Sequence, residues 1–155
     1  MTIHEEKAVA LFKEGYNCAQ AVFAAFSDVT GIDEKTSVRL ASSFGGGFGR
    51  QREVCGAVSG MVMALGAIEG YDSPTDQIAK KEQYATVQSL MKQFADINGS
   101  YICRELLGLQ EKENSDPTPT PRSDSFYKKR PCSELVGEAA RLLDCYLDNK
   151  KTASP

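Results

Sequence analysis

The sequence predicts an all-α protein, folded as a compact bundle of about six or seven helices. Apolar residues recur at helical spacing in one segment after another, and no alternating run is long enough to demand a strand. With 155 residues, 41% of them hydrophobic, the chain can bury one sizeable core. We therefore expect a single helical domain over residues 1–149, with an exposed loop at about 111–130 and a flexible tail at 150–155.

Local signals divide the N-terminal half into three helices and a loop. Apolar residues at helical spacing predict a first helix near the N-terminus. Asn17 with Gln20 three residues later forms a capping-box pattern, so a second helix is expected to begin at Cys18. Asp33 is placed to cap a short third helix. The dense glycines of residues 43–49 then predict a loop.

The C-terminal half is divided in the same way. An uncharged helix is expected from about Val54, and a long polar helix from residues 73–75 to Asn98. Ser100 is placed to cap a short helix after that. Pro131 suits the first position of a final helix that runs toward the C-terminus.

Charge and hydropathy exclude several classes of function. The 18 Lys and Arg residues against 21 Asp and Glu give a net charge of -3, with both signs spread along the chain, so no nucleic-acid partner is expected. The N-terminus carries Glu5 and Glu6 where an export signal needs positive charge, and we therefore expect a cytoplasmic protein. The longest uncharged run, residues 54–68, is shorter than the roughly 20 residues that span a membrane. Homo-oligomer formation stays open.

The cysteines are the strongest functional signal. In the reducing compartment expected here, thiols tend to bind metals or act in catalysis rather than form structural disulfides. Four of the five cysteines fall within the first turn of an expected helix: Cys18, Cys55, Cys103 and Cys132. A helix N-terminus favours the thiolate, which attacks disulfides and binds metals. Cations that lie near these cysteines in the sequence are expected to lower the thiol pKa further: Arg50, Arg52, Arg104, Lys129 and Arg130.

The fifth cysteine and the single histidine are left out of the candidate site. Cys145 falls roughly 140° around the last helix from Cys132, in the later half of that helix. His4 is expected to be a bystander. The spacings between the four candidate cysteines match no CxxC zinc ribbon, ferredoxin run or thioredoxin-like pair, so the fold must assemble any joint site. The alternative that these cysteines are ordinary buried apolar residues stays open.

Several glycines are candidates for contact with a cofactor: Gly45, Gly46, Gly47, Gly56 and Gly60. Gly56 and Gly60 expose backbone on the face of the uncharged helix next to Cys55, so either a cofactor or a closely packed helix fits there. The glycine stretch with Arg50 and Arg52 offers backbone N–H groups to an anion. It matches neither GxGxxG nor GxxxxGK[ST], and no strand precedes it, so phosphate binding is not favoured.

At these positions the chain resembles the C_GCAxxG_C_C family, small bacterial and archaeal proteins that are named after their cysteine pattern. The first cysteine of the family is similar to Cys18, within Gly-Tyr-Asn-Cys-Ala-Gln-Ala-Val at residues 15–22. The central motif is similar to Cys-Gly-Ala-Val-Ser-Gly at residues 55–60, behind Phe-Gly-Gly-Gly at residues 44–47.

The remaining cysteines of the family are similar to Cys103, at the head of Cys-Arg-Glu-Leu-Leu-Gly, and to Cys132, which follows Pro131. The resemblance covers most of the chain, from about residue 6 to residue 143. It departs from the family name at one position, because Val54 rather than glycine precedes the second cysteine.

The resemblance implies a redox-active protein without an assigned reaction, and whether it is an enzyme stays open. Our first hypothesis is a thiol-based oxidoreductase, in which the four cysteines exchange thiol and disulfide states or pass electrons to an unknown redox partner. The alternative is a non-enzymatic module in which the same four thiolates hold an iron-sulfur cluster or zinc. Related modules occur beside electron-transfer centres in larger proteins, which keeps this alternative open.

Overall fold

A computed structural model describes residues 1–109 and 116–153 and confirms the all-α prediction. The fold is 72% helical, and the described segments contain no strand, only an isolated bridge that pairs Val54 with Ile102. The longer helices are α1 (Ile3–Lys13), α2 (Cys18–Ala25), α4 (Glu34–Ala41), α6 (Gly56–Glu69), α7 (Gln77–Asn98) and α10 (Cys132–Ala153). The shorter ones are α3 (Ser27–Thr30), the 3-10 turn η1 (Ser42–Phe44), α5 (Gly45–Phe48), α8 (Cys103–Leu106) and α9 (Asp124–Lys129).

The predicted helix caps are confirmed at Asn17 and Asp33 but not at Ser100, because Ile102 precedes α8 and no side chain caps that helix. The Asn17 side chain accepts a hydrogen bond from the Gln20 N–H at 2.9 Å, and the Gln20 side chain accepts one from the Asn17 N–H at 3.0 Å. The Asp33 carboxylate accepts the Thr36 N–H at 2.8 Å. Because a cap satisfies N–H groups that have no partner inside the helix, these side chains fix where α2 and α4 begin.

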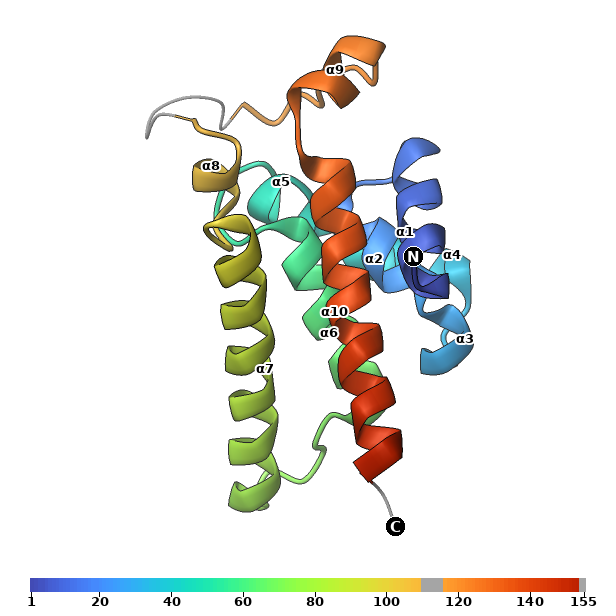
Figure 1. Cartoon of the computed structure of the whole chain (residues 1–155), viewed down its shortest axis with the longest axis vertical. Coiled ribbons are helices and arrows are strands. Elements are labelled where there is room, and N and C mark those ends of the chain that lie inside the picture. The colour runs from blue at the N-terminus through green and yellow to red at the C-terminus, as the bar shows by residue number, and fades with distance from the viewer. Residues whose placement is uncertain (110–115, 154–155) are drawn as a thin grey trace.

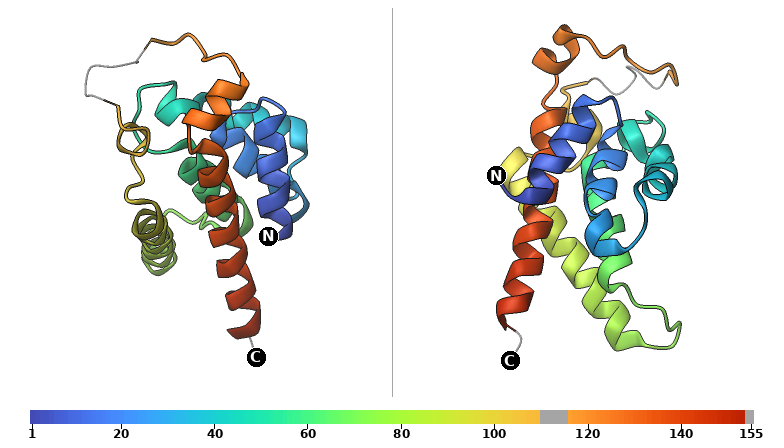
Figure 2. Two further views of the ribbon diagram at one scale, coloured as in Figure 1. Left: turned by 45° about the horizontal axis from the view of Figure 1, so that its top comes forward. Right: turned by 90° about the vertical axis from the view of Figure 1, so that its right-hand side faces the viewer.

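The core is built around α2, which packs against α1, α4, α6 and α10. This helix is apolar on nearly all sides, and a helix of that kind must be covered all round. Its approach to α6 is close, since a Cβ at Gly60 would lie 2.6 Å from the Ala19 carbonyl oxygen. Close helix packing therefore accounts for Gly60. The C-terminal helix α10 runs along the middle of the molecule, with α1 on one side and α7 on the other (Figure 1; Figure 2).

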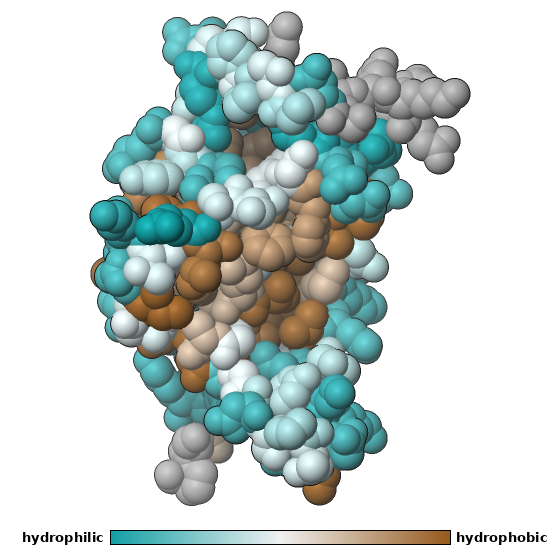
Figure 3. Space-filling model, turned by 180° about the vertical axis from the view of Figure 1, so that it is seen from behind, coloured by the Kyte–Doolittle hydropathy of each residue, from teal (hydrophilic) through white to brown (hydrophobic). Residues whose placement is uncertain are grey.

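The long helix α7 is less covered than the core helices. Of its side chains only Leu90 and Phe94 are buried. The face of the molecule opposite to that in Figure 1 shows a band of apolar side chains across its middle (Figure 3). No helix in the described ranges is both long and apolar enough to cross a membrane.

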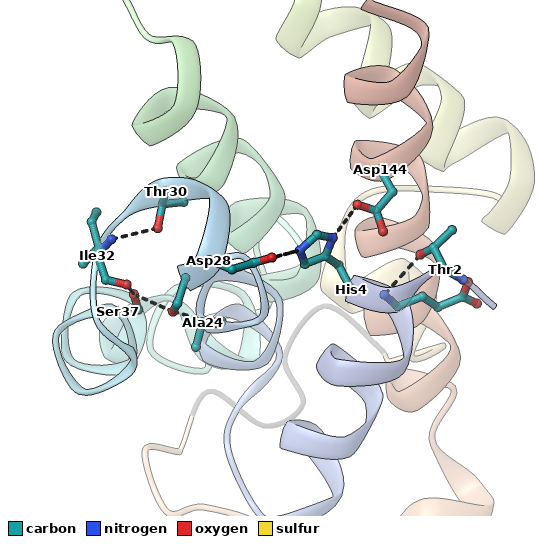
Figure 4. A network of polar contacts seen from close by, with 10 residues as sticks. Thr2, His4, Ala24, Asp28, Thr30, Ile32, Ser37 and Asp144 are labelled. Carbon is teal, nitrogen blue, oxygen red and sulfur yellow. Dashed lines mark hydrogen bonds and ion pairs between the residues drawn. The ribbon is translucent and has the colours of Figure 1, made fainter. Parts of the chain in front are cut away.

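A polar cluster, in which His4 and Asp144 are buried, joins α1, α3 and α10 (Figure 4). His4 of α1 lies with its Nδ1 atom 2.6 Å from Oδ1 of Asp144 and its Nε2 atom 2.9 Å from Oδ1 of Asp28. The imidazole ring stacks on Phe26, with the ring centres 4.3 Å apart. His4 therefore connects helices that are distant in sequence.

Two expectations about irregular segments differ from the structure. Helix α9 lies inside the expected loop, because Ser123 caps it by accepting the Phe126 N–H at 3.2 Å. Helix α10 continues to Ala153, into the expected tail. Residues 110–115 of that loop and 154–155 of that tail lie outside the described residues.

Candidate functional site: a cavity lined by four cysteines

The four candidate cysteines begin four different helices, as predicted. Cys18, Cys103 and Cys132 are the first residues of α2, α8 and α10, and Cys55 is the residue before α6. All four line one cavity of about 370 Å³, at the end of the molecule that carries α8 and α9 (Figure 1). Cys145 does not line it and is exposed. The fold thus gathers sulfur atoms that are far apart in the sequence.

A short backbone pairing connects Cys55 with Cys103. The Cys55 N–H donates to the Tyr101 carbonyl at 2.8 Å, and the Cys103 N–H donates to the Glu53 carbonyl at 2.6 Å. These bonds flank the antiparallel bridge between residues 54 and 102. A pairing this short leaves no alternating pattern in the sequence, so sequence analysis missed it.

Cys18 and Cys132 both line the cavity, and side-chain hydrogen bonding between them is the largest influence on the pKa of each. Gly56 makes room for this arrangement, because a Cβ at that position would lie 3.1 Å from the Cβ of Cys18. The hydrogen bond raises the pKa of Cys18 well above its usual value, and burial adds to the increase. It lowers the pKa of Cys132 to about 7, supported by the charges of Arg130 and Arg122. Cys132 is therefore the thiol of this pair that ionises first.

The expectation that every helix-start cysteine has a lowered pKa is wrong for Cys18 and also for Cys55 and Cys103. Burial raises the pKa of Cys55 to about 12. Burial also raises the pKa of Cys103, although Arg52 donates from Nη1 to its sulfur at 3.7 Å. Here the free-energy cost of removing a thiolate from water exceeds the stabilisation that the helix terminus or the cation provides.

The glycine-rich segment and the residues that follow it form an irregular connection, in which three left-handed residues are not glycine. Phe48, Arg50 and Arg52 have φ values of 66°, 66° and 64°, a region that non-glycine residues rarely adopt. Gly47, at φ 71°, admits no side chain, because a Cβ would lie 2.6 Å from the Glu53 nitrogen and 2.8 Å from the Cβ of Cys103. Backbone strain of this kind gathers at functional sites, and here it directs two arginines toward the cavity.

Arginines from three regions line the cavity: Arg50, Arg52, Arg122 and Arg130. Sequence analysis missed Arg122, whose guanidinium donates to the carbonyls of Phe12 and Tyr16 at 3.0 and 2.9 Å. These contacts span more than a hundred residues, so no local signal reveals them. Arg104 donates to the Gln51 carbonyl at 3.2 Å and does not line the cavity. The side chain of Lys129 lies outside the described part of the chain.

The predicted glycines take two different places. Gly45, Gly46 and Gly56 line the cavity, and their role in holding a cofactor stays a prediction. Gly47 and Gly60 do not line it and instead face protein atoms.

The donor set does not form a preorganised metal site. Throughout the described residues, no three His, Cys, Asp or Glu side chains lie close enough together to hold a metal ion. Instead, Cys18 and Cys132 interact as a pair, and Arg52 lies beside the sulfur of Cys103. An iron-sulfur cluster or zinc does not fit this arrangement as it stands, and we derive no chemistry through either.

An all-α bundle whose helix starts bring four cysteines to one cavity defines a class of cysteine-centred helical proteins. The chain belongs to the family described as "Putative redox-active protein (C_GCAxxG_C_C)", whose profile matches residues 16–146. It is also similar to an uncharacterized protein of Archaeoglobus fulgidus, with 24% identity over 157 residues, covering 96% of this chain and 95% of the relative. No solved structure matches the chain.

Proposed function

We propose that this protein is a thiol–disulfide redox protein in which Cys132 is the attacking thiol and Cys18 the resolving thiol. The observation that carries the proposal is that Cys18 and Cys132 line one cavity together with four arginines, where the interaction between the two thiols lowers the pKa of Cys132. A pKa of about 7 suits an attacking thiol, because the thiolate is well populated near neutral pH and still nucleophilic. Membership of a redox-active family agrees with this assignment.

In this proposal Cys55 and Cys103 do not react, and they support the structure around Cys18 and Cys132. Cys55 and Cys103 have raised pKa values and stay protonated near neutral pH. Their backbones hold the loop from which Arg52 approaches the cavity. In this proposal they shape the pocket, and Cys145 takes no part.

The test is to identify the disulfide that forms. The fully reduced protein is treated with one equivalent of a small disulfide, and the products are mapped by peptide mass spectrometry and thiol counting. We expect an internal disulfide between Cys18 and Cys132, with three of the five thiols left free. Cys132→Ser is expected to form no internal disulfide, and Cys18→Ser to stop at the mixed disulfide.

The matched control is Cys145→Ser, which removes an exposed thiol away from the cavity and should leave the product unchanged. A disulfide between Cys55 and Cys103, or four cavity thiols that stay free, would contradict the proposal. So would stoichiometric zinc or iron in anaerobically purified protein, which would favour the metal-binding alternative.

A further inference from the structure

We infer that the cysteine cavity takes small disulfides that carry carboxylate or similar negative charge, in preference to neutral or cationic ones. This inference deepens the proposed function and rests on it. It is drawn from the charges around the cavity, the way these charges are held, and the size of the space.

The lining of the cavity has one sign of charge. Four arginines contribute to it, and no Asp or Glu does so within the described residues. Asp116, which is exposed and binds Thr118, interacts with Arg50 from outside the lining. A cleft with one sign of charge and low-dielectric walls concentrates ligands of the opposite sign.

Arg50, Arg122 and Arg130 are held by hydrogen bonds to neutral groups. Arg50 donates from Nη1 to the Thr118 carbonyl and to Oγ1 of Thr120, and Arg130 donates to the same hydroxyl at 3.4 Å. Arg122 donates to two carbonyls and lies over the Phe12 ring, 4.3 Å from its centre. These contacts fix the guanidinium groups without neutralising them.

The arginines also act on one another. Burial lowers the pKa of Arg50, and the neighbouring charges of Arg52 and Arg130 lower it further. The electrostatic repulsion between like charges held close together is reduced when an anion binds between them. Two of these arginines, Arg50 and Arg52, have a left-handed backbone, a conformation that costs free energy in a residue other than glycine.

The space fits a small molecule. A volume of about 370 Å³ lies near the lower end of the range for small-ligand sites. Phe12, Leu106 and Leu107 add apolar walls against which the hydrocarbon part of a ligand can pack. The carboxylate groups of such a disulfide would contact the arginines, with its sulfur atoms near Cys132.

The reaction balances with the substrate as oxidant. The Cys132 thiolate attacks one sulfur of RS–SR, so a Cys132–SR bond forms, the S–S bond of the substrate breaks, and RS⁻ leaves. Cys18 then gives up its proton and attacks the Cys132 sulfur, which closes the Cys18–Cys132 disulfide and releases the second sulfur. The protein dithiol loses two electrons, the substrate gains them, and the products are RS⁻ and RSH. The arginines stabilise the negative charge that develops on the leaving sulfur.

The experiment compares three symmetrical disulfides of similar size and different charge: 3,3′-dithiodipropionate, bis(2-hydroxyethyl) disulfide and cystamine. Single-turnover rates are measured with reduced Cys145→Ser protein, and each rate is divided by that of dithiothreitol with the same disulfide. We expect the anionic disulfide to react faster than the neutral one by on the order of tenfold at low salt, and cystamine to react more slowly than both. Added salt should reduce the difference, because it screens the charges.

Variants test which charges are responsible. Arg50→Gln and Arg130→Gln are each expected to reduce the preference for the anionic disulfide by several-fold, while Arg39→Gln, at an exposed position of α4 outside the cavity, should leave it unchanged. If an arginine variant does not fold, as judged by circular dichroism, the effect of salt on the relative rates of the parent protein still tests whether charge causes the preference. Equal normalised rates for all three disulfides would overturn this inference and leave the proposed function standing. No reaction of Cys18 and Cys132 with any of them would overturn the proposed function itself.

Discussion

His4 and Cys132 have the same exposure, 9% of the residue surface, and both belong to clusters of titratable side chains that join several helices. Around His4, each ring nitrogen has a carboxylate within 3.0 Å and the ring stacks on Phe26. Around Cys132, the neighbouring Cys18 and several arginines lower the pKa of the thiol, and the cavity gives access to it. Equally buried side chains therefore have different roles: His4 stabilises the fold, whereas Cys132 is placed to react. The difference is that both ring nitrogens of His4 already have partners, while the sulfur of Cys132 faces a cavity that a ligand can enter.

The largest expected effect comes from removing the reactive sulfur. In Cys145→Ser protein, the additional change Cys132→Ser should slow the reaction with a small disulfide at neutral pH by on the order of 1,000-fold, because burial raises the pKa of each cavity thiol that remains. Stopped-flow measurement of released thiol checks this. A loss of less than about tenfold would mean that another thiol attacks, and the contrast with His4 would fail.

The second effect belongs to the His4 cluster and is a loss of stability. His4→Ala leaves the carboxylate of Asp144, which is 8% exposed, without its imidazole partner. We expect the free energy of unfolding to fall by about 3 kcal/mol, which corresponds to a decrease in Tm of roughly 6–12 °C. Urea titration and thermal melting measure it.

The control for this variant is Asp28→Asn, because the Asp28 side chain is 61% exposed and its loss should cost under about 1 kcal/mol. Neither variant should change the rate at which Cys132 reacts once the protein is folded. A slower reaction in folded His4→Ala protein would show that the two clusters are coupled.

The third effect is a pH dependence of stability that originates in the cysteine cavity. The pKa of Cys132 is lowered from its ordinary value of 9.0 to about 7, so between these values the folded state has lost a proton that the unfolded state still binds. Stability from this group is therefore present above pH 9 and is lost as the pH falls through 7, a difference of about 3 kcal/mol.

The raised pKa values of Cys18, Cys55 and Cys103 act in the opposite direction above pH 9, where the unfolded state ionises first. We expect urea stability to rise from pH 6.5 to about 8.5 and to fall at higher pH. In Cys132→Ser protein the rise should disappear while the fall persists. A rise that survives in this variant would assign it to other groups.

The sequence predicted what local residue patterns determine, namely the caps at Asn17 and Asp33 and the positions of four cysteines at helix starts. It could not predict the bridge between Val54 and Ile102, or the contact of Arg122 with Phe12, because both join residues that are far apart and leave no periodic signal. These contacts bring the cysteines and their cations to one cavity.

The same limit explains the error about thiol acidity. A helix start is visible in the sequence, whereas the burial that raises the pKa of Cys55 and Cys103 depends on what the other helices cover. The identity of the acidic thiol therefore required the geometry. Similarly, His4 could not be assigned a role until its two carboxylates, 24 and 140 residues away in the chain, were placed beside it.

The smallest effect tests the hydrogen bond that distinguishes Cys132 from the other sulfurs. Cys18→Ala removes the donor, so the pKa of Cys132 should rise by about one unit and its thiolate fraction at neutral pH should fall by about fivefold. Cys18→Ser keeps an O–H donor and should restore part of the loss. The pH dependence of iodoacetamide alkylation at Cys132, followed by mass spectrometry in both variants, measures the shift. Because neither variant can close the internal disulfide, this readout depends on acidity alone, and an unchanged midpoint in Cys18→Ala would show that the arginines set the pKa without help from Cys18.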